Sequence, residues 1–402
     1  LAAITIAKTA GHFGRQSWSQ LPRISGCIIV QNRHSSGHVD TKLTAMQRGT
    51  GGRSSFSGIV ATVFGANGAL GRSVCNRLGK IGSQIIVPYR CTADEVMQSL
   101  RPVGDLGQVL FFPFDLRDEA AIRKSLQYSN VVINLIGRNY ETKNFNFRDV
   151  HVEGARRITR IAKECGVEKV IHVSHLNAKK DLQVIWKGSE FLKSKYEAEL
   201  AVREEFPEAI IFKPADMFGQ GDQFLMYFNR KSRRNGLTSK FPLWKKGEHT
   251  IKQPVYVGDV AEGIVQAIRN PDLVGKNVEC VGPQRYYLSD IVDYIIQILR
   301  RQDTFRRTDR TFWLRLKAQY FEFLPVQPYY SKEKLEMEGI TDWTTPGTLT
   351  LEDLGVSLQQ FDTYAYFVLH PYRHRSFYSE KLGEFADPVS PKPAEFYQPK
   401  TA

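Results

Sequence analysis

Residues 58–90 read GIVATVFGANGALGRSVCNRLGKIGSQIIVPYR, and this stretch decides the fold. It opens with a short apolar run, residues 59–64, that ends in a glycine, which is the pattern of a strand buried on both faces. Apolar residues then recur at helical spacing before a second apolar run, Gln84–Tyr89. The stretch therefore predicts a strand, a glycine turn, a helix and a second strand.

The turn between the first strand and the helix, residues 65–71, reads GANGALG. Gly65 permits a tight turn, Gly68 lets a pyrophosphate approach the backbone, and Gly71 lets helix and strand pack closely. Free N–H groups and the positive end of the helix dipole would bind the phosphates. The sequence thus predicts a dinucleotide site that includes Gly65, Asn67, Gly68, Ala69, Leu70 and Gly71.

The end of the second strand distinguishes NAD from NADP. An NAD site usually places a carboxylate there to bind the ribose hydroxyls. Here the strand ends in Tyr89 and Arg90, and the next carboxylate is Asp94. Arg90, assisted by Arg72 at the start of the helix, would form charge-assisted hydrogen bonds with a 2′-phosphate. The alternative is that Arg90 is a solvated loop charge. We expect one NADPH per chain, with Tyr89 also in contact.

Strands and helices continue to alternate as far as Pro214. Strands are expected at residues 109–114, 131–136, 169–174 and 209–213, with helices between them at 120–128, 152–165 and 190–205. This order predicts an α/β fold with a doubly wound parallel sheet of the Rossmann type. Ligands bind beyond the carboxyl ends of such strands. Further cofactor contacts are therefore expected at Asp115, Leu135, Ile136 and Gly137, for which ordinary capping and packing is the alternative.

The chain divides into five parts by composition. Residues 1–35 hold Lys8, Arg15, Arg23 and Arg33, and no carboxylate precedes Asp40. This pattern is typical of a mitochondrial targeting peptide, and a disordered basic tail is the alternative. A linker follows at 36–57, then the nucleotide domain at 58–215. A smaller C-terminal α/β lobe is expected at 216–386, with strands at 253–257 and 277–281 and helices at 259–269 and 289–300. The proline-rich tail, 387–402, is expected to be extended or disordered.

The net charge restricts the kinds of partner that the chain can bind. The net charge is +13, which suits nucleic acid, anionic lipid or an acidic protein. Since no nucleic-acid motif is present, we expect lipid headgroups or a protein partner.

The five cysteines have no metal-site spacing and are expected to be reduced thiols. No apolar run reaches the ~18 residues of a membrane span, so any membrane contact would be peripheral.

Four motifs resemble the extended and atypical short-chain dehydrogenase/reductase family: GANGALG, Asp115-Leu116, the NLIG that ends at Gly137, and the VGDVA of residues 257–261. The resemblance covers residues 58–283. It implies a cofactor site that also includes Leu116, Ser174, Lys195 and Pro214.

The same resemblance indicates that catalysis has been lost. Active members of the family use a tyrosine with a lysine four residues later, together with a serine or threonine. Here Phe191 precedes Lys195, and Leu176 takes the serine position. No catalytic residue is therefore expected. Tyr196 or His175 would serve as the catalytic residue only if the register of the helix differed from the alignment used here.

Longer strings resemble the NADPH-binding accessory subunits of mitochondrial respiratory complex I over residues 51–355. They include GSQIIVPYRC, SNVVINLIGRNYETKNF and GVEKVIHVSHLNA. This resemblance implies a peripheral subunit on the matrix side of the inner membrane, near the quinone site, with other complex I subunits as partners. It would support assembly rather than transfer electrons. The rival hypotheses are an NADP-dependent reductase or isomerase, and a soluble NADP(H)-binding redox sensor.

One segment, residues 304–324, interleaves five basic residues with aromatic ones. This composition suits a membrane interface. The alternative is an ordinary helix packed on a neighbouring subunit.

Overall fold

The computed structural model describes residues 48–90, 98–179, 188–229, 240–301, 306–309, 316, 318–320, 331–374 and 386–394. The expected targeting peptide and most of the basic, aromatic segment at 304–324 lie outside these described residues.

An eight-stranded sheet forms the centre of the described chain, and all of its strand pairs are parallel. Its strands stand in the order β14-β11-β6-β5-β4-β1-β2-β3. The order reverses between β1 and β4, which is where open α/β sheets bind ligands. The strands are β1 (Val60–Phe64), β2 (Gln84–Tyr89), β3 (Val109–Pro113), β4 (Val131–Asn134), β5 (Lys169–Val173), β6 (Ile210–Pro214), β11 (Asn277–Cys280) and β14 (Leu349–Thr350).

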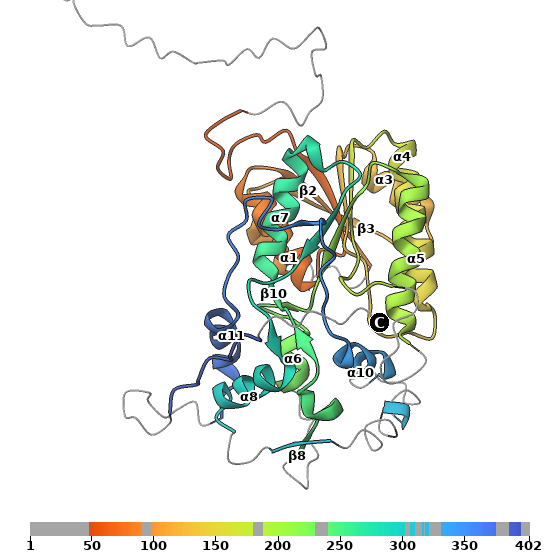
Figure 1. Ribbon diagram of the computed structural model, residues 1–402. Coiled ribbons are helices and arrows are strands. Elements are labelled where there is room, and N and C mark those ends of the chain that lie inside the picture. The colour runs from red at the N-terminus through yellow and green to blue at the C-terminus, as the bar shows by residue number, and fades with distance from the viewer. Residues whose placement is uncertain are drawn as a thin grey trace, which may run out of the picture. The chain divides into compact units, whose positions relative to one another are not determined.

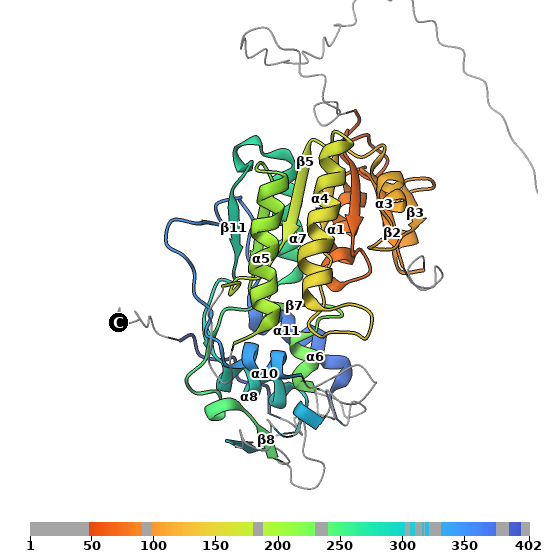
Figure 2. The same ribbon diagram turned by 90° about the vertical axis from the view of Figure 1, so that its right-hand side faces the viewer.

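Helices cover both faces of the sheet (Figures 1 and 2). One face packs against α1 (Ala69–Lys80) and α7 (Val257–Arg269). The other face packs against α3 (Glu119–Leu126), α4 (Gly154–Glu164) and α5 (Glu190–Glu205). Since successive strand residues point to opposite faces, Val63 lies in the first apolar layer and its neighbour Phe64 in the second.

The predicted fold class is confirmed: the chain is a doubly wound α/β protein. One detail differs from the sequence-based expectation. Both β11 and α7 were expected in the C-terminal lobe, yet β11 pairs with β6 in the main sheet and α7 packs beside α1. The chain returns to the sheet because Val278, Ile264 and Ile268 are buried in the same apolar layer as the first strand.

A second apolar cluster lies in the C-terminal lobe, around Phe218, Ile291 and Phe361. Its helices are α6 (Phe224–Asn229), α8 (Leu288–Ile298) and α11 (Phe361–Leu369). Three two-stranded sheets accompany them: β7 (Met217–Phe218) with β10 (Val255–Tyr256), β9 (Ile251–Lys252) with β12 (Tyr286–Tyr287), and β8 (Lys240–Pro242) with β13 (Arg306–Thr308).

Helix α10 (Lys332–Gly339) lies by the N-terminal end of α5, and both ribbon views agree on this placement (Figures 1 and 2). Within the tail, the described residues 386–394 run along the lobe, where Ser390 Oγ donates a hydrogen bond to Asp362 Oδ2 at 3.0 Å.

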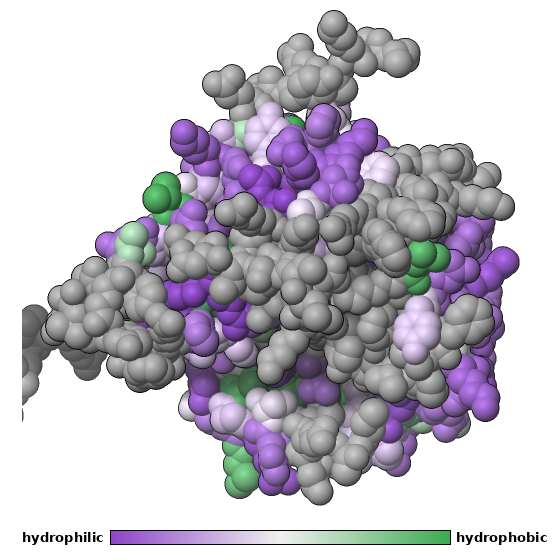
Figure 3. All heavy atoms as spheres, turned by 90° about the horizontal axis from the view of Figure 1, so that it is seen from below, coloured by the Kyte–Doolittle hydropathy of each residue, from purple (hydrophilic) through white to green (hydrophobic). Residues whose placement is uncertain are grey.

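On the face seen from below, hydrophilic side chains predominate among the described residues, and hydrophobic ones form small separate groups (Figure 3). No helix among the described residues is both long enough and apolar enough to span a bilayer. Within the expected interface segment, Arg307 lies on β13, and its Nε is 3.0 Å from Asp293 Oδ1 of α8.

Candidate functional site

A cavity of about 770 Å³ opens beyond the carboxyl ends of β1, β4, β5 and β6. A volume of this size is typical of sites for cofactors and other small molecules. The predicted site residues that line it come from well-separated parts of the chain: Gly65, Asn67, Gly68, Ala69, Leu70, Gly71, Tyr89, Arg90, Leu116, Leu135, Ile136, Gly137, Ser174, Lys195 and Pro214. Two predicted residues, Arg72 and Asp115, are not part of the lining.

The glycine turn has the geometry that the sequence predicts. Gly65 has a φ of +83°, which favours glycine. A Cβ on Gly71 would lie 2.4 Å from Gly65 O, so no side chain fits there. A Cβ on Gly68 would meet the same oxygen at an ordinary 3.5 Å. No side chain caps the N-terminus of α1, which leaves its first N–H groups available for phosphate.

Two arginines flank one aromatic ring at the expected adenosine end. The guanidinium carbon of Arg90 lies 5.9 Å from the centroid of the Phe145 ring, and that of Arg117 lies 4.4 Å from it. The sequence analysis did not predict Arg117, because this residue is related to Arg90 only by their shared contact with the Phe145 ring. Asp115 is exposed, and its Oδ1 accepts a hydrogen bond from Arg117 N at 2.8 Å, within its own loop. Its carboxylate is therefore engaged locally rather than in the cavity.

Arg72 lies beside the cavity rather than in its lining. Its side chain is close to Gly221, since a Cβ on that glycine would fall 2.6 Å from Arg72 Nη2. Gly221 itself lines the cavity.

Lys195 lies at the floor of the cavity. Its Nζ donates a hydrogen bond to Val173 O at 3.1 Å and lies close beneath Gly137, whose Cβ would be only 3.0 Å away. Burial lowers the pKa of Lys195 to about 8, and the nearby Glu199 carboxylate opposes this shift. The amine is thus held between the end of β5 and the chain segment that follows β4, at the cavity.

Phe191 is the residue that the sequence resemblance aligns with the family's proton-donating tyrosine. Its side chain is only 7% exposed and lines the cavity. Three aromatic rings surround it, with centroids 5.3 Å away for His151, 6.0 Å for Phe147 and 6.1 Å for His175. The position therefore serves packing, and it offers no group that could transfer a proton.

The serine position is also apolar. Leu176 is buried against Ala215 and Val281. Ser174, two residues earlier, does line the cavity, but its Oγ donates to Glu199 Oε1 at 2.5 Å. Glu199 is in turn 2.7 Å from Lys213 Nζ. The hydroxyl of Ser174 is therefore committed to a buried ion pair.

The two alternative catalytic residues are poorly placed. Tyr196 is partly buried and is not among the residues that line the cavity. His175 does line it, yet burial lowers the pKa of His175 to about 4, so its ring is neutral near pH 7. Its Nδ1 accepts a hydrogen bond from Asn177 N at 3.1 Å. His175 thus has the features of a structural histidine.

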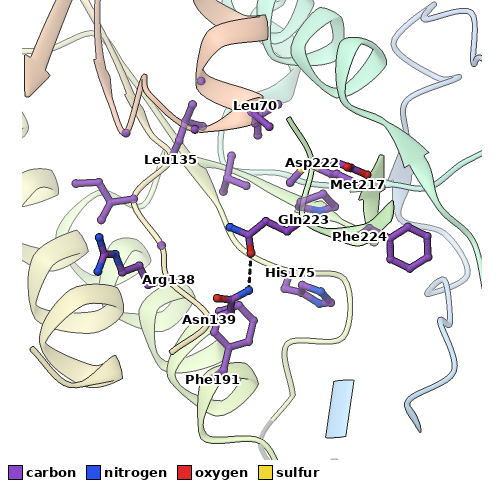
Figure 4. A pocket seen from close by; sticks show the side chains of 18 of the residues that line it. Leu70, Leu135, Arg138, Asn139, His175, Phe191, Met217, Asp222, Gln223 and Phe224 are labelled. Atoms are coloured by element: carbon purple, nitrogen blue, oxygen red, sulfur yellow. Dashed lines mark hydrogen bonds between the residues drawn. The ribbon is translucent and has the colours of Figure 1, made fainter. Parts of the chain in front are cut away.

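The glycine-containing loop after β7 adds cavity-lining residues that the sequence analysis missed. Asp222 lines the cavity and is buried, and its Oδ1 has no hydrogen-bond partner among the described residues. Burial raises the pKa of Asp222 to about 7. Next to it, Gln223 Oε1 accepts a hydrogen bond from Asn139 Nδ2 at 2.6 Å, which links two walls of the cavity (Figure 4). The glycines at 219 and 221 were the available signal for this loop.

Comparison with known proteins agrees with the fold. Residues 61–281 match the model of the NAD dependent epimerase/dehydratase family. The solved dTDP-glucose 4,6-dehydratase DesIV of Streptomyces venezuelae, with NAD and TYD bound, is similar with a TM-score of 0.56 and 18% identity. That similarity covers 81% of this chain and all of DesIV, and it concerns the fold.

Two mitochondrial proteins are closer in sequence. The rat (Rattus norvegicus) NADH dehydrogenase (ubiquinone) 1 alpha subcomplex subunit 9 is 45% identical over 85% of this chain and 88% of its own length. The Neurospora crassa NADH-ubiquinone oxidoreductase 40 kDa subunit is 34% identical over 82% of this chain and 84% of its own length. The chain therefore belongs to the NAD dependent epimerase/dehydratase family and, more narrowly, to the family of these mitochondrial NADH dehydrogenase subunits.

Proposed function

We propose that this chain is a non-catalytic accessory subunit of mitochondrial complex I, in which a bound NADPH stabilises the fold. Relatives that match over most of its length are subunits of that enzyme. One observation supports the absence of chemistry: the glycine turn and Lys195 line the cavity, while Phe191 takes the place of the tyrosine. Such a site binds a dinucleotide and holds its ribose without a proton donor.

The choice of NADPH over NADH rests on charge. Arg90 lines the cavity at the end of β2, and the guanidinium of Arg117, which is not part of the lining, lies 4.4 Å from the centroid of the Phe145 ring that Arg90 also approaches. A 2′-phosphate at the Arg90 guanidinium would form charge-assisted hydrogen bonds that a bare ribose hydroxyl cannot match. Bound at a concentration 100-fold above its dissociation constant, such a ligand stabilises a fold by about 2.7 kcal/mol.

The proposed location is the matrix side of the inner membrane, as a peripheral subunit. The acid-free, basic N-terminus supports import into mitochondria. The partners would be other complex I subunits, and the basic surface suits anionic lipid headgroups as additional ligands.

Native gel electrophoresis of mitochondrial membranes tests the assignment to the complex. We expect the chain to migrate with complex I and to be depleted when that complex is missing. A chain that always migrates alone would favour the rival reading as an independent NADP-dependent reductase or isomerase. Assays of the purified chain with NADPH and a panel of carbonyl compounds distinguish that enzyme from a structural subunit, because only an enzyme would show sustained nucleotide oxidation.

A further inference from the structure

A segment near the C-terminus, residues 331–342, forms one wall of the cavity. This C-terminal wall comprises α10 and the residues that follow it. Its Lys334, Met337 and Glu338 line the same cavity as the glycine turn, although more than half of the chain separates the two in sequence. The wall therefore brings a segment from the C-terminal part of the chain into contact with the proposed nucleotide site.

The first anchor of the wall is Glu333, which binds the start of α5. Its Oε2 accepts hydrogen bonds from Ser189 Oγ at 2.5 Å and from Phe191 N at 3.1 Å. Ser189 is the residue that caps α5. A carboxylate at this point also interacts favourably with the positive end of the helix dipole. Glu333 thus attaches the wall to the helix that holds Lys195.

The second anchor is apolar and involves Phe191 itself. Its ring shares a buried cluster with Ile340 and with the partly buried Met337, both from the C-terminal wall. The Phe191 ring therefore packs against the C-terminal wall. A phenol hydroxyl would add a polar atom to this cluster, and a buried hydroxyl without a partner is unfavourable.

The third anchor is an ion cluster around Lys252. Its Nζ donates to Met337 O at 2.9 Å and lies 3.0 Å from Asp216 Oδ2 and 3.6 Å from Asp342 Oδ1. Asp342 also accepts hydrogen bonds from Asn177 Nδ2 at 2.7 Å and from Gln253 N at 3.0 Å. Asp216 and Lys252 both line the cavity, so this anchor also borders the nucleotide site.

These anchors belong to the elements that position the dinucleotide. Phe191 is one helical turn before Lys195 on α5, and Asp216 follows Pro214 at the end of β6. Helix α10 spans only eight residues, and helices this short are marginal in water without tertiary contacts. The ordered conformation of the wall therefore depends on its contacts with α5 and with the end of β6. A bound dinucleotide would fix the geometry of the same two elements.

We propose that residues 331–342 are a strap whose docking is coupled to dinucleotide binding, so that the nucleotide orders the C-terminal part of the chain. This inference rests on the proposed nucleotide site and adds a consequence to it. Coupling between two binding events is reciprocal. A weakened strap must therefore lower nucleotide affinity by the same factor by which the nucleotide strengthens the strap.

Hydrogen exchange on the full chain, with and without saturating NADPH, tests the coupling directly. We expect amides of residues 332–342 to exchange at least about fivefold more slowly with NADPH, which is the lower end of typical coupling. The matched variants are Glu333→Ala, which removes the anchor, and Glu190→Ala, which removes a neighbouring carboxylate that is 72% exposed. The first should weaken NADPH binding about fivefold or more, and the second should leave it unchanged.

The outcomes separate the two proposals. Binding of NADPH by the wild-type chain without slower exchange in 332–342 overturns the strap and leaves the nucleotide site intact. Absence of NADPH binding overturns both. Because the exchange experiment uses the wild-type chain, the strap stays testable even if Glu333→Ala fails to fold. Equal NADPH affinity for folded Glu333→Ala and Glu190→Ala would also overturn it.

Discussion

The ring of Phe191 meets the ring of His151 edge to face, with 5.3 Å between their centroids and 84° between their planes. Both ring nitrogens of His151 are engaged: Nε2 accepts from Arg138 N at 3.2 Å, and Nδ1 lies 2.8 Å from Ser194 Oγ. Burial lowers the pKa of His151 to about 2, so it is neutral near pH 7. Phe191 therefore packs against a neutral histidine whose two ring nitrogens are already engaged.

A first prediction concerns Phe191→Tyr. The substitution adds a polar hydroxyl to a ring that is only 7% exposed and packs with Met337 and Ile340, so we expect the free energy of unfolding to fall by roughly 1–3 kcal/mol. We expect no NADPH oxidation with carbonyl substrates, because Leu176 still occupies the serine position. Denaturant unfolding and steady-state absorbance measure the two effects. Sustained turnover by the wild-type chain would contradict the absence of chemistry.

Arg90→Asp should discriminate between cofactors. The substitution replaces a cation with an anion at the end of β2, so NADPH binding should weaken by about 10- to 100-fold while NADH binding changes little. Calorimetry with both nucleotides measures this difference. Lys80→Asp makes the same change of charge at the far, exposed end of α1 and serves as the control. Equal losses for NADPH and NADH would show that Arg90 does not bind the phosphate.

Two glycines in one turn should respond differently to alanine. Gly71→Ala places a Cβ 2.4 Å from a backbone oxygen, so we expect a loss of stability of roughly 1–3 kcal/mol even without ligand. Gly68→Ala has an ordinary 3.5 Å contact and should leave the free protein stable while weakening nucleotide binding. Thermal unfolding with and without NADPH separates the cases. If both variants unfold at the same temperature without ligand, the close contact at Gly71 is not the reason that the turn requires glycine there.

Asp222 should make stability depend on pH. Burial raises its pKa in the folded chain to about 7, above the ordinary value of 3.8. The folded state then binds a proton more tightly than the unfolded state, and the contribution to stability is lost as the pH rises from about 4 to about 7. We expect Asp222→Asn to remove this loss, which is on the order of 2–4 kcal/mol by pH 7.5.

Unfolding free energies of both proteins, measured across this pH range, provide the comparison. The variant keeps a side-chain oxygen that can accept from Leu225 N, as Asp222 Oδ2 does at 2.9 Å. Parallel pH profiles for the two proteins would exclude Asp222 as the titrating group.

Local sequence was sufficient for the turn and for the alternating strands and helices around it. The spacing of Gly65, Gly68 and Gly71, the apolar strands and the Phe191–Lys195 pair are all readable within short windows, and the structure places these residues around one cavity.

The contacts that the sequence analysis did not predict join segments that are far apart in the sequence. Glu333 reaches Phe191 from 142 positions away, and nothing local to either residue indicates this contact. The return of β11 to the sheet was missed for the same reason, since a short apolar strand fits equally well in either lobe. The unpartnered carboxylate of Asp222 follows from burial, which one sequence does not show.

The most direct test is the nucleotide content of complex I purified under mild conditions from mitochondria that contain this chain. Denaturation of the complex should release one NADP(H) per copy of this chain, mainly as NADPH, in addition to the complex's other cofactors. The amount should fall in parallel when Arg90→Asp replaces the wild-type chain. If no NADP(H) is released, or if prolonged incubation with carbonyl compounds oxidises the bound NADPH, the proposed role as a structural nucleotide-binding subunit is wrong.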